Sequence, residues 1–174
     1  PPAGTCLNAV DIPPVGGDTL FANQHLAWEA LPADRKAIYA DLIAVHSARL
    51  PYAPDGTYGA KDKCRSMDIR PSEAALATQT HPLVPAHPET GRRGFYSTLG
   101  YIIGIEGMAQ EAAIALLMEL QHWQGDERFV FAQRWEPGML VMWDNHSVLH
   151  RATGGYEGYR RELHRTTIAA WNGT

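Results

Sequence analysis

Residues 139–170 read MLVMWDNHSVLHRATGGYEGYRRELHRTTIAA, and this stretch carries both strong strand signals and the densest set of reactive side chains. Residues 139–143 and 160–170 are β-like runs, and a third such run covers 128–134. Pro137 and Gly138 mark the turn between 128–134 and 139–143. Because helical inserts separate the strands without regular strand–helix alternation, the sequence favours a mainly β, mostly antiparallel sandwich with helices packed outside it.

The N-terminal part predicts one strand followed by two helices. Residues 5–10 form a short, partly apolar run that Pro13-Pro14 and Gly16-Gly17 end, which is typical of a strand entering a turn. Asp18 or Thr19 can then cap a short helix, whose apolar residues are Leu20, Phe21, Trp28 and Leu31. Pro32 suits the first turn of a second helix, whose apolar face holds Ile38, Leu42 and Ile43.

The middle of the chain predicts a long excursion and an amphipathic helix. Residues 48–85 are rich in Pro, Gly, Ser, Asp and Thr, and long loops in compact domains are often lids or binding loops. Residues 95–105 could supply one or two strands. Apolar residues at i, i+3, i+4 and i+7 then predict a helix with one buried stripe, formed by Ala113, Leu116, Leu117 and Leu120.

Composition places the chain among ordinary folded proteins. Its 174 residues fit a single domain over 1–174, 45% are hydrophobic, and 15 Lys+Arg against 19 Asp+Glu leave a formal net charge of −4. Mild acidity without a basic cluster argues against nucleic acid or an anionic membrane as a partner, and no apolar run is long enough to span a bilayer. Two cysteines, Cys6 and Cys64, fit a reducing compartment, so we expect a cytoplasmic protein.

Strand alternation in 160–170 places two arginines on one face. Arg161, Leu163 and Arg165 share that face, whereas Arg160, Glu162 and His164 share the other. If the first face points into the sandwich, two guanidinium groups enter the interior, where an unpaired cation is costly unless an anion meets it. In the alternative, this face lies in solvent and the arginines form surface ion pairs. Periodicity alone leaves both arrangements open.

His150 is the natural candidate for a metal ligand, since a neutral imidazole suits iron, zinc, copper and nickel. His146 lies four residues earlier, a spacing that on a helix would bring both histidines to one metal, but the surrounding residues are strand-like. The His-Glu-x-x-His pattern of many zinc enzymes is absent from the sequence.

Four motifs stand out by their order and spacing: Gly16-Gly17-Asp18-Thr19, His81-Pro-Leu-Val, His87-Pro88, and Trp143-Asp144-Asn145 with His150. Arg161 and Arg165 follow His150 by eleven and fifteen residues. In these features the chain resembles the taurine dioxygenase and 2,4-dichlorophenoxyacetate dioxygenase family of Fe(II)- and 2-oxoglutarate-dependent oxygenases. The resemblance covers about residues 5–167 and implies a double-stranded β-helix, or jelly roll.

The resemblance implies a role for each matching residue. His150 corresponds to the distal histidine of the iron site. Arg161 corresponds to the arginine that binds the distal carboxylate of 2-oxoglutarate, and Thr19 supplies a hydroxyl that shares this carboxylate. Arg165 corresponds to a second arginine, which faces the acidic group of the substrate or the keto-acid end of the cosubstrate. Tyr101 falls where relatives place an aromatic residue of the substrate pocket.

The chain departs from the family pattern at the metal. Relatives supply the other two iron ligands from a His-x-Asp pair that precedes the Gly-Gly-Asp-Thr turn, and this sequence contains no His-x-Asp. The chain starts at Pro1 without Met, so we expect a fragment whose N-terminal part, with this pair, is missing; a true pseudoenzyme is the alternative. His87-Pro88-Glu89 is the only His-x-carboxylate in the sequence, but it falls at a family position outside the metal site, and Pro88-Glu89-Thr90-Gly91 is expected to form a turn. His146 is expected to be a supporting or surface residue, and Trp143 and Asn145 are expected to support the site from behind.

The function implied by the resemblance is that of a dioxygenase. It couples decarboxylation of 2-oxoglutarate, to succinate and CO2, to hydroxylation of a small anionic substrate by O2. An aryloxyalkanoate or a sulfonate fits Arg165, and the run 160–163 favours the former. Two other classes stay open: a zinc hydrolase that uses His146, His150 and His164, and a non-catalytic β-sandwich that only binds an anion. A homo-oligomer is common among relatives, and the sequence leaves the oligomeric state open.

Overall fold

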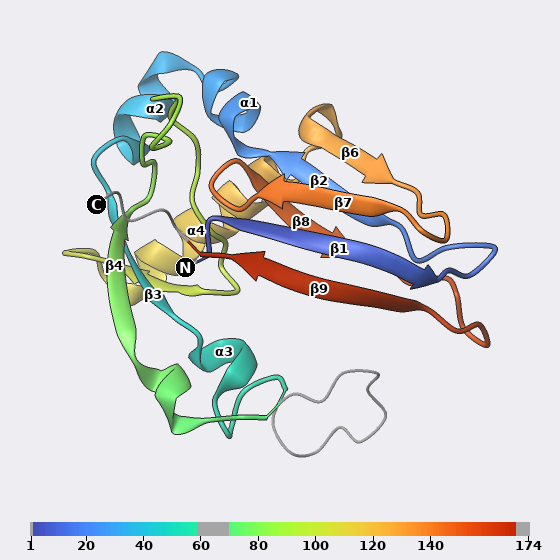
Figure 1. Cartoon of the computed structure of the whole chain (residues 1–174). Coiled ribbons are helices and arrows are strands. Elements are labelled where there is room, and N and C mark those ends of the chain that lie inside the picture. The colour runs from blue at the N-terminus through green and yellow to red at the C-terminus, as the bar shows by residue number, and fades with distance from the viewer. Residues whose placement is uncertain (1, 59–69, 170–174) are drawn as a thin grey trace. The chain divides into compact units, whose positions relative to one another are not determined.

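The computed structural model describes residues 2–58 and 70–169 (Figure 1). The chain forms two compact units. The first unit comprises Pro1–Ala30, Ala86–Gly94 and Gln124–Thr174, and the second comprises Leu31–Pro85 and Phe95–Trp123. Each unit therefore draws on segments that lie far apart in the sequence. The expectation of one domain over 1–174 stays a prediction.

The first unit contains a three-stranded sheet centred on β1 (Gly4–Asp11). β7 (Leu140–Asp144) and β9 (Glu162–Ile168) pair with β1 on either side, both antiparallel. Thr5 pairs with Trp143 on one side and with Thr167 on the other, so these three side chains share one face of the sheet. The predicted strands at 5–10, 139–143 and 160–170 are confirmed, with ends that differ by one or two residues. Residue 170 lies outside the described residues.

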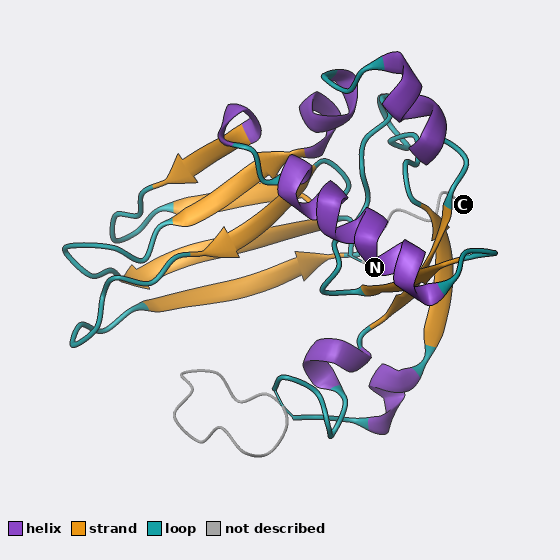
Figure 2. Ribbon diagram, turned by 180° about the vertical axis from the view of Figure 1, so that it is seen from behind, coloured by secondary structure: helices purple, strands orange, loops and turns teal. Residues whose placement is uncertain are grey.

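A second three-stranded sheet of the first unit is centred on β2 (Thr19–Asn23), between β6 (Val130–Gln133) and β8 (Val148–Ala152). Phe21 pairs with Phe131 and with His150, so the three share one face. Trp143 joins the two sheets, because its ring centroid lies 5.1 Å from that of Phe21 and 4.8 Å from that of His150. The two sheets thus face each other across aromatic contacts, and Figure 2 shows their strands in orange.

The helix predicted to start at Asp18 or Thr19 is wrong in its position. Thr19–Asn23 is the central strand of the second sheet, and the helix α1 covers Gln24–Glu29. Asn23 caps that helix, since its side chain accepts hydrogen bonds from the backbone N–H groups of His25 and Leu26. Two flanking strands supply hydrogen bonds to 19–23 that no local cap could match, so tertiary pairing overrides the local signal.

The second unit contains the sheet β4–β3–β5, formed by Thr78–Pro82, Ile43–Ser47 and Ile102–Ile105, all antiparallel. Its helices are α2 (Ala33–Tyr39), α3 (Arg49–Tyr52), the 3-10 turn η1 (Glu73–Leu76) and α4 (Gln110–Gln124), whose last residue belongs to the first unit. The largest fully buried apolar side chains of this unit are Phe95, Leu83, Ile102, Leu120 and Val84. The first unit adds the 3-10 turn η2 (Glu127–Phe129) just before β6.

Three expectations for the second unit have different outcomes. The amphipathic helix is confirmed as α4, with Ala113, Leu117 and Leu120 buried. The helix after Pro32 ends at Tyr39, so Ile43 lies in β3 instead of on a helical face. The 48–85 excursion is more regular than expected, since it contains α3, η1 and β4, and its residues 59–69 lie outside the described part.

Within the described ranges, 2–58 and 70–169, none of the helices has the length and apolar character needed to cross a membrane.

Candidate anion- and metal-binding site

The inner faces of the two sheets in the first unit bring together most of the residues singled out by the sequence. His150 lies on β8, opposite Phe21 and 4.8 Å from the ring of Trp143. Burial of part of the ring lowers the pKa of His150, and the positive charge of Arg165 lowers it further, although one side of the residue stays exposed. A lowered pKa favours the neutral imidazole, which is the form that binds metals.

Arg161 is fixed in place just before β9. Its Nε donates a hydrogen bond of 3.0 Å to the carbonyl oxygen of Gly17, and its guanidinium carbon lies 5.7 Å from the ring centroid of Tyr156. Gly17 has φ +70°, and a Cβ added there would stand 2.9 Å from Cδ and Nε of Arg161. Gly17 therefore provides both the acceptor and the space that this arginine needs.

The glycine turn is itself held against the loop between β8 and β9. The Gly17 N–H donates to the carbonyl oxygen of Gly154 at 3.0 Å, and the Thr153 N–H donates to that of Asp18 at 2.8 Å. Gly16, with φ +67°, approaches so closely that an added Cβ would lie 2.4 Å from the carbonyl oxygen of Gly155. Side chains are excluded at both Gly16 and Gly17, which explains the Gly-Gly of the motif in physical terms.

Thr19 directly follows this turn as the first residue of β2 and is almost fully buried. Its Oγ1 accepts a hydrogen bond of 3.1 Å from the indole Nε1 of Trp135, which is also buried. Since the oxygen is the acceptor in this bond, the hydroxyl proton of Thr19 stays available for a second acceptor. The indole thus orients a buried hydroxyl as a donor.

The structure combines the two arrangements that periodicity left open for the arginines. Arg161 is half-buried, whereas Arg165 is exposed, although it lies close enough to His150 for its charge to act on that ring. Arg165 pairs with Leu7 of β1, and β9 is the edge strand of its sheet, so solvent can reach one side of Arg165. Arg161, just before the same strand, is less exposed because it contacts the Gly17 carbonyl and the Tyr156 ring, which alternation does not encode.

The opposite face of β9 carries a separate charged cluster. Arg160 forms an ion pair with Glu162, and Nε2 of His164 lies 2.9 Å from Oε1 of the same carboxylate. The hydrogen bonds of His164 and then of Arg160 lower the pKa of Glu162. The predicted division of 160–165 between two faces is confirmed.

The three histidines of the zinc-hydrolase alternative do not converge. His164 lies on the face of β9 opposite to that of Arg165, whereas His150 contacts Trp143 on the inner side. Among the residues that the structure describes, no three His, Cys, Asp or Glu side chains are grouped to hold a metal ion. This geometry argues against the zinc hydrolase.

Tyr101 belongs to the second unit, where it is exposed and its backbone carbonyl accepts a hydrogen bond of 2.9 Å from the Ser47 N–H. Its contact with a substrate stays a prediction. Asn145, expected to support the site, does tie chain segments together: its Nδ2 donates to the carbonyl oxygen of Pro2 and to Oγ1 of Thr5, at 3.0 and 3.1 Å.

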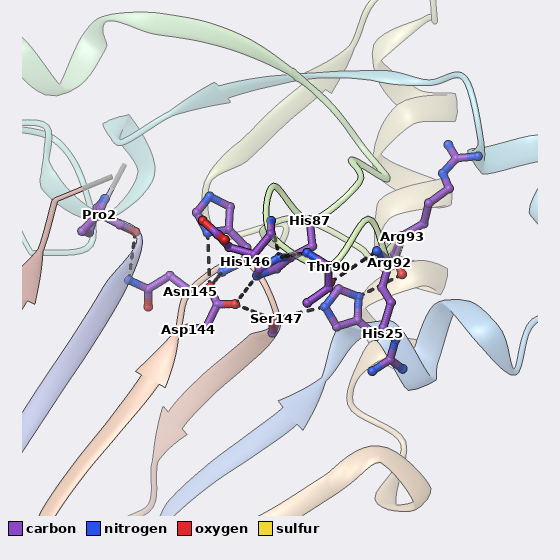
Figure 3. Close-up of polar contacts among 11 residues, drawn as sticks. Pro2, His25, His87, Thr90, Arg92, Arg93, Asp144, Asn145, His146 and Ser147 are labelled. Carbon is purple, nitrogen blue, oxygen red and sulfur yellow. Dashed lines mark hydrogen bonds and ion pairs between the residues drawn. The ribbon is translucent and has the colours of Figure 1, made fainter. Parts of the chain in front are cut away.

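Sequence reasoning missed the polar network around Asp144, drawn in Figure 3. Oδ2 of Asp144 accepts hydrogen bonds from Nε2 of His87 at 2.5 Å and from Oγ of Ser147 at 2.6 Å, and Oδ1 accepts one from the His146 N–H at 2.7 Å. Partial burial raises the pKa of Asp144, but the hydrogen bonds from Ser147, His146 and His87 outweigh it and lower the pKa to about 2. Asp144 is therefore an ionised carboxylate that links the loop at His87 to the turn at Ser147.

The signal that could have indicated this network is the turn at His87. The predicted turn over Pro88-Glu89-Thr90-Gly91 is confirmed, since the Gly91 N–H donates to the His87 carbonyl and Ala86 pairs with Arg93. The backbone N–H of His146 donates to Asp144, and the role of His146 as a supporting or surface residue stays a prediction. A local pattern could not predict that His87 contacts Asp144, because the two residues are 57 positions apart in the sequence.

These features define a class: an antiparallel two-sheet β unit whose inner side presents a locked arginine, an oriented hydroxyl and a histidine. The chain belongs to the taurine catabolism dioxygenase TauD, TfdA family, whose family model matches residues 1–167. It is 35% identical, over 164 residues, to the alpha-ketoglutarate-dependent 2,4-dichlorophenoxyacetate dioxygenase of Cupriavidus pinatubonensis. The aligned residues cover 92% of this chain and 53% of that protein.

Solved structures agree with this assignment. A taurine dioxygenase from Burkholderia xenovorans is 32% identical with a TM-score of 0.78, covering 97% of this chain and 52% of that one. AAD-2 in complex with Mn(II) and N-oxalylglycine is 27% identical with a TM-score of 0.82, covering 98% of this chain and 64% of that one. The chain spans about half the length of the curated relatives it matches.

Proposed function

We propose that this chain forms the cosubstrate-binding part of an Fe(II)- and 2-oxoglutarate-dependent dioxygenase, built on a double-stranded β-helix and acting on a small anionic substrate. The observation that carries the proposal is Arg161, which is locked by the carbonyl of Gly17, two residues before the buried hydroxyl of Thr19. A pre-positioned guanidinium next to a hydroxyl donor is the arrangement expected for a carboxylate ligand.

The residues present fit 2-oxoglutarate. The bond from Arg161 to Gly17 uses Nε, so the two terminal nitrogens are left to make a paired contact with a carboxylate. The glycine at position 17 leaves room that a Cβ would fill. Because the Thr19 oxygen accepts a hydrogen bond from the Trp135 indole, the Thr19 hydroxyl proton points away from that indole. Together these groups would bind the distal carboxylate and exclude water from one side of it.

The residues present fit an iron ion only in part. His150 supplies one imidazole, and the described segments group no three side chains of ligand type around a metal. A complete two-histidine, one-carboxylate site therefore needs ligands beyond those that the described residues bring together. Bound iron and 2-oxoglutarate would supply the oxidising chemistry that releases succinate and CO2, and the protein would contribute placement and charge.

Arg165 is the residue we assign to the substrate. Its exposed guanidinium lies near His150 on the open edge of the sheet, which suits an anionic group arriving from solvent. Relatives named for 2,4-dichlorophenoxyacetate and for taurine support an aryloxyalkanoate or a sulfonate. Trp143, whose indole Nε1 is buried without a hydrogen-bond partner in the described part of the chain, would form the apolar floor beside it.

Two arginine variants test the proposal. Arg161→Ala should raise the Kd and KM for 2-oxoglutarate at least tenfold, because it removes a charge-assisted pair of hydrogen bonds worth about 1.5–3 kcal/mol. Arg165→Ala should leave 2-oxoglutarate binding within about twofold and weaken the anionic substrate instead. Arg134→Ala, at an exposed position, is the matched control.

The readouts are calorimetric titration of 2-oxoglutarate and succinate release coupled to O2 uptake. Wild-type kinetics in both arginine variants would overturn the site assignment. Binding of 2-oxoglutarate without succinate release, in a protein that carries all three iron ligands, would instead indicate the non-catalytic anion-binding protein.

A further inference from the structure

The hydrogen-bond network around Asp144 joins three segments of the first unit. His25 comes from α1, His87 from the loop 86–94, Asp144 from the end of β7 and Ser147 from the turn that follows it (Figure 3). We refer to Asp144, Ser147, His87 and His25 as the Asp144 clamp. None of the four is assigned to the cosubstrate or the substrate in the proposed function.

The protonation of His87 follows from its neighbours. Its Nδ1 lies 3.1 Å from the Glu89 N–H and 3.2 Å from the Thr90 N–H, and since both are donors, Nδ1 is the acceptor. The ring proton is therefore on Nε2, which donates to Oδ2 of Asp144 at 2.5 Å. The backbone N–H groups of the turn 87–90 thus favour the tautomer of His87 that can donate to the Asp144 carboxylate.

His25 closes the clamp from the other side. Its Nδ1 must donate to the Arg93 carbonyl oxygen at 2.9 Å, because that oxygen can only accept, and its Nε2 lies 3.1 Å from Oγ of Ser147. Gly94 makes this possible, since a Cβ at that position would stand 2.7 Å from Nδ1 of His25. The Ser147 hydroxyl lies between His25 and the Asp144 carboxylate and donates its proton to that carboxylate.

The clamp acts on the short turn between β7 and β8, and these two strands carry two residues of the site. Trp143 immediately precedes Asp144 at the end of β7, and His150 lies three residues after Ser147 on β8. The backbone of the same turn is tied as well, because the Gln24 N–H donates to the Ser147 carbonyl oxygen at 2.9 Å. Moving the turn would therefore change the 4.8 Å contact between Trp143 and His150.

We propose that Asp144 and His87 are positioning residues, which hold the β7–β8 turn so that Trp143 and His150 keep their places on the inner face. The part of this inference that concerns turnover rests on the proposed function. Thr19 pairs with Ala152, five residues beyond Ser147, so the cosubstrate end of the site lies about 16 Å along the strand from the clamp. Loss of the clamp should therefore disturb the His150 end and spare the Arg161 end.

The test compares His87→Ala with His87→Gln, whose amide can replace the Nε2–H donor, and adds Ser147→Ala as a milder variant. His122→Ala, at an exposed position of α4, is the matched control. Ring nitrogen NMR signals of His87 should report the Nε2–H tautomer in the wild-type chain. The Trp143 indole and His150 ring signals should shift in His87→Ala and return toward wild type in His87→Gln.

The second readout is kinetic. In His87→Ala, kcat for 2-oxoglutarate turnover should fall about tenfold, because a small displacement of reacting groups is costly, while KM for 2-oxoglutarate stays within about twofold. His87→Gln should recover most of the rate, and Ser147→Ala should lose less than His87→Ala.

The outcomes separate the two proposals. Unchanged Trp143 and His150 signals in His87→Ala, or equal losses in kcat and 2-oxoglutarate affinity, would overturn the clamp as a positioning device. A wild-type chain that neither binds nor turns over 2-oxoglutarate would overturn the proposed function, and the NMR comparison would still decide whether the clamp positions the β7–β8 turn.

Discussion

Arg161 donates a hydrogen bond from Nε to the carbonyl oxygen of Gly17, over 3.0 Å and across 144 positions of the chain. The bond links the entry of β2 to the entry of β9, the two strands that carry Thr19 and Arg165. Because the arginine is fixed through Nε, its conformational freedom is reduced before any ligand arrives, which lowers the entropic cost of binding. Preorganisation of this kind is the physical basis for the predictions at the cosubstrate end.

Gly17→Ala should weaken 2-oxoglutarate binding about tenfold or more, because the added Cβ would stand 2.9 Å from Cδ and Nε of Arg161. Gly138→Ala is the control: Gly138 also has positive φ, +84°, but an added Cβ there has nothing within 4 Å. Both variants should lose about 1 kcal/mol of stability from backbone strain. Equal 2-oxoglutarate affinities in the two, by calorimetry, would show that the space at Gly17 is not needed.

Trp135→Phe should destabilise the fold by about 1 kcal/mol, since it removes the indole N–H that Thr19 accepts at 3.1 Å. A double-mutant cycle with Thr19→Val, measured by urea unfolding, should give a coupling of about 0.5–1.5 kcal/mol. The single variant should also raise KM for 2-oxoglutarate, because the hydroxyl loses its orientation. Strictly additive effects on stability would contradict the role of this hydrogen bond.

The Asp144 carboxylate should make stability depend on pH in the acid range. Its folded pKa of about 2 lies below the ordinary value of 3.8, so its contribution is fully present above about pH 4 and is lost as pH falls through 2. After allowance for its partial exposure, we expect about 1–2 kcal/mol. Asp144→Asn should be less stable than wild type at pH 5, and the difference should shrink toward pH 2 in urea unfolding. A difference that does not change with pH would exclude this explanation.

A buried amide pair in the first unit offers a test of packing apart from the site. Nε2 of Gln124 donates to Oε1 of Gln24 at 2.9 Å, and Nε2 of Gln24 donates to the Ala22 carbonyl at 3.0 Å. Gln124→Ala should cost about 1–3 kcal/mol, because it leaves a buried oxygen without its donor. Gln121→Ala, exposed on the same helix, should change the unfolding free energy by less than about 0.5 kcal/mol.

Local patterns predicted the elements whose residues interact with near neighbours or alternate regularly. The i, i+3, i+4, i+7 stripe of α4 and the alternation that divides Arg161 and Arg165 from Arg160 and His164 are both present in the structure. Thr19–Asn23 was predicted as helix because Asp18 and Thr19 are good caps, whereas its strand state depends on β6 and β8, more than a hundred residues away. β8 was indicated only as strand-like residues around His146 and His150, without bounds.

By itself, the sequence determined the order and spacing of the motifs, the mainly β character, and which side chains of the last strand share a face. These properties follow from backbone periodicity, which is local. Only the tertiary structure decided that Arg161 is held by Gly17 while Arg165 stays at an open edge, and that His87 completes a carboxylate clamp at Asp144. The hydrogen-bond partner of such a polar group comes from a segment far away in the sequence. Periodicity carries no information about which distant segment the fold brings next to it.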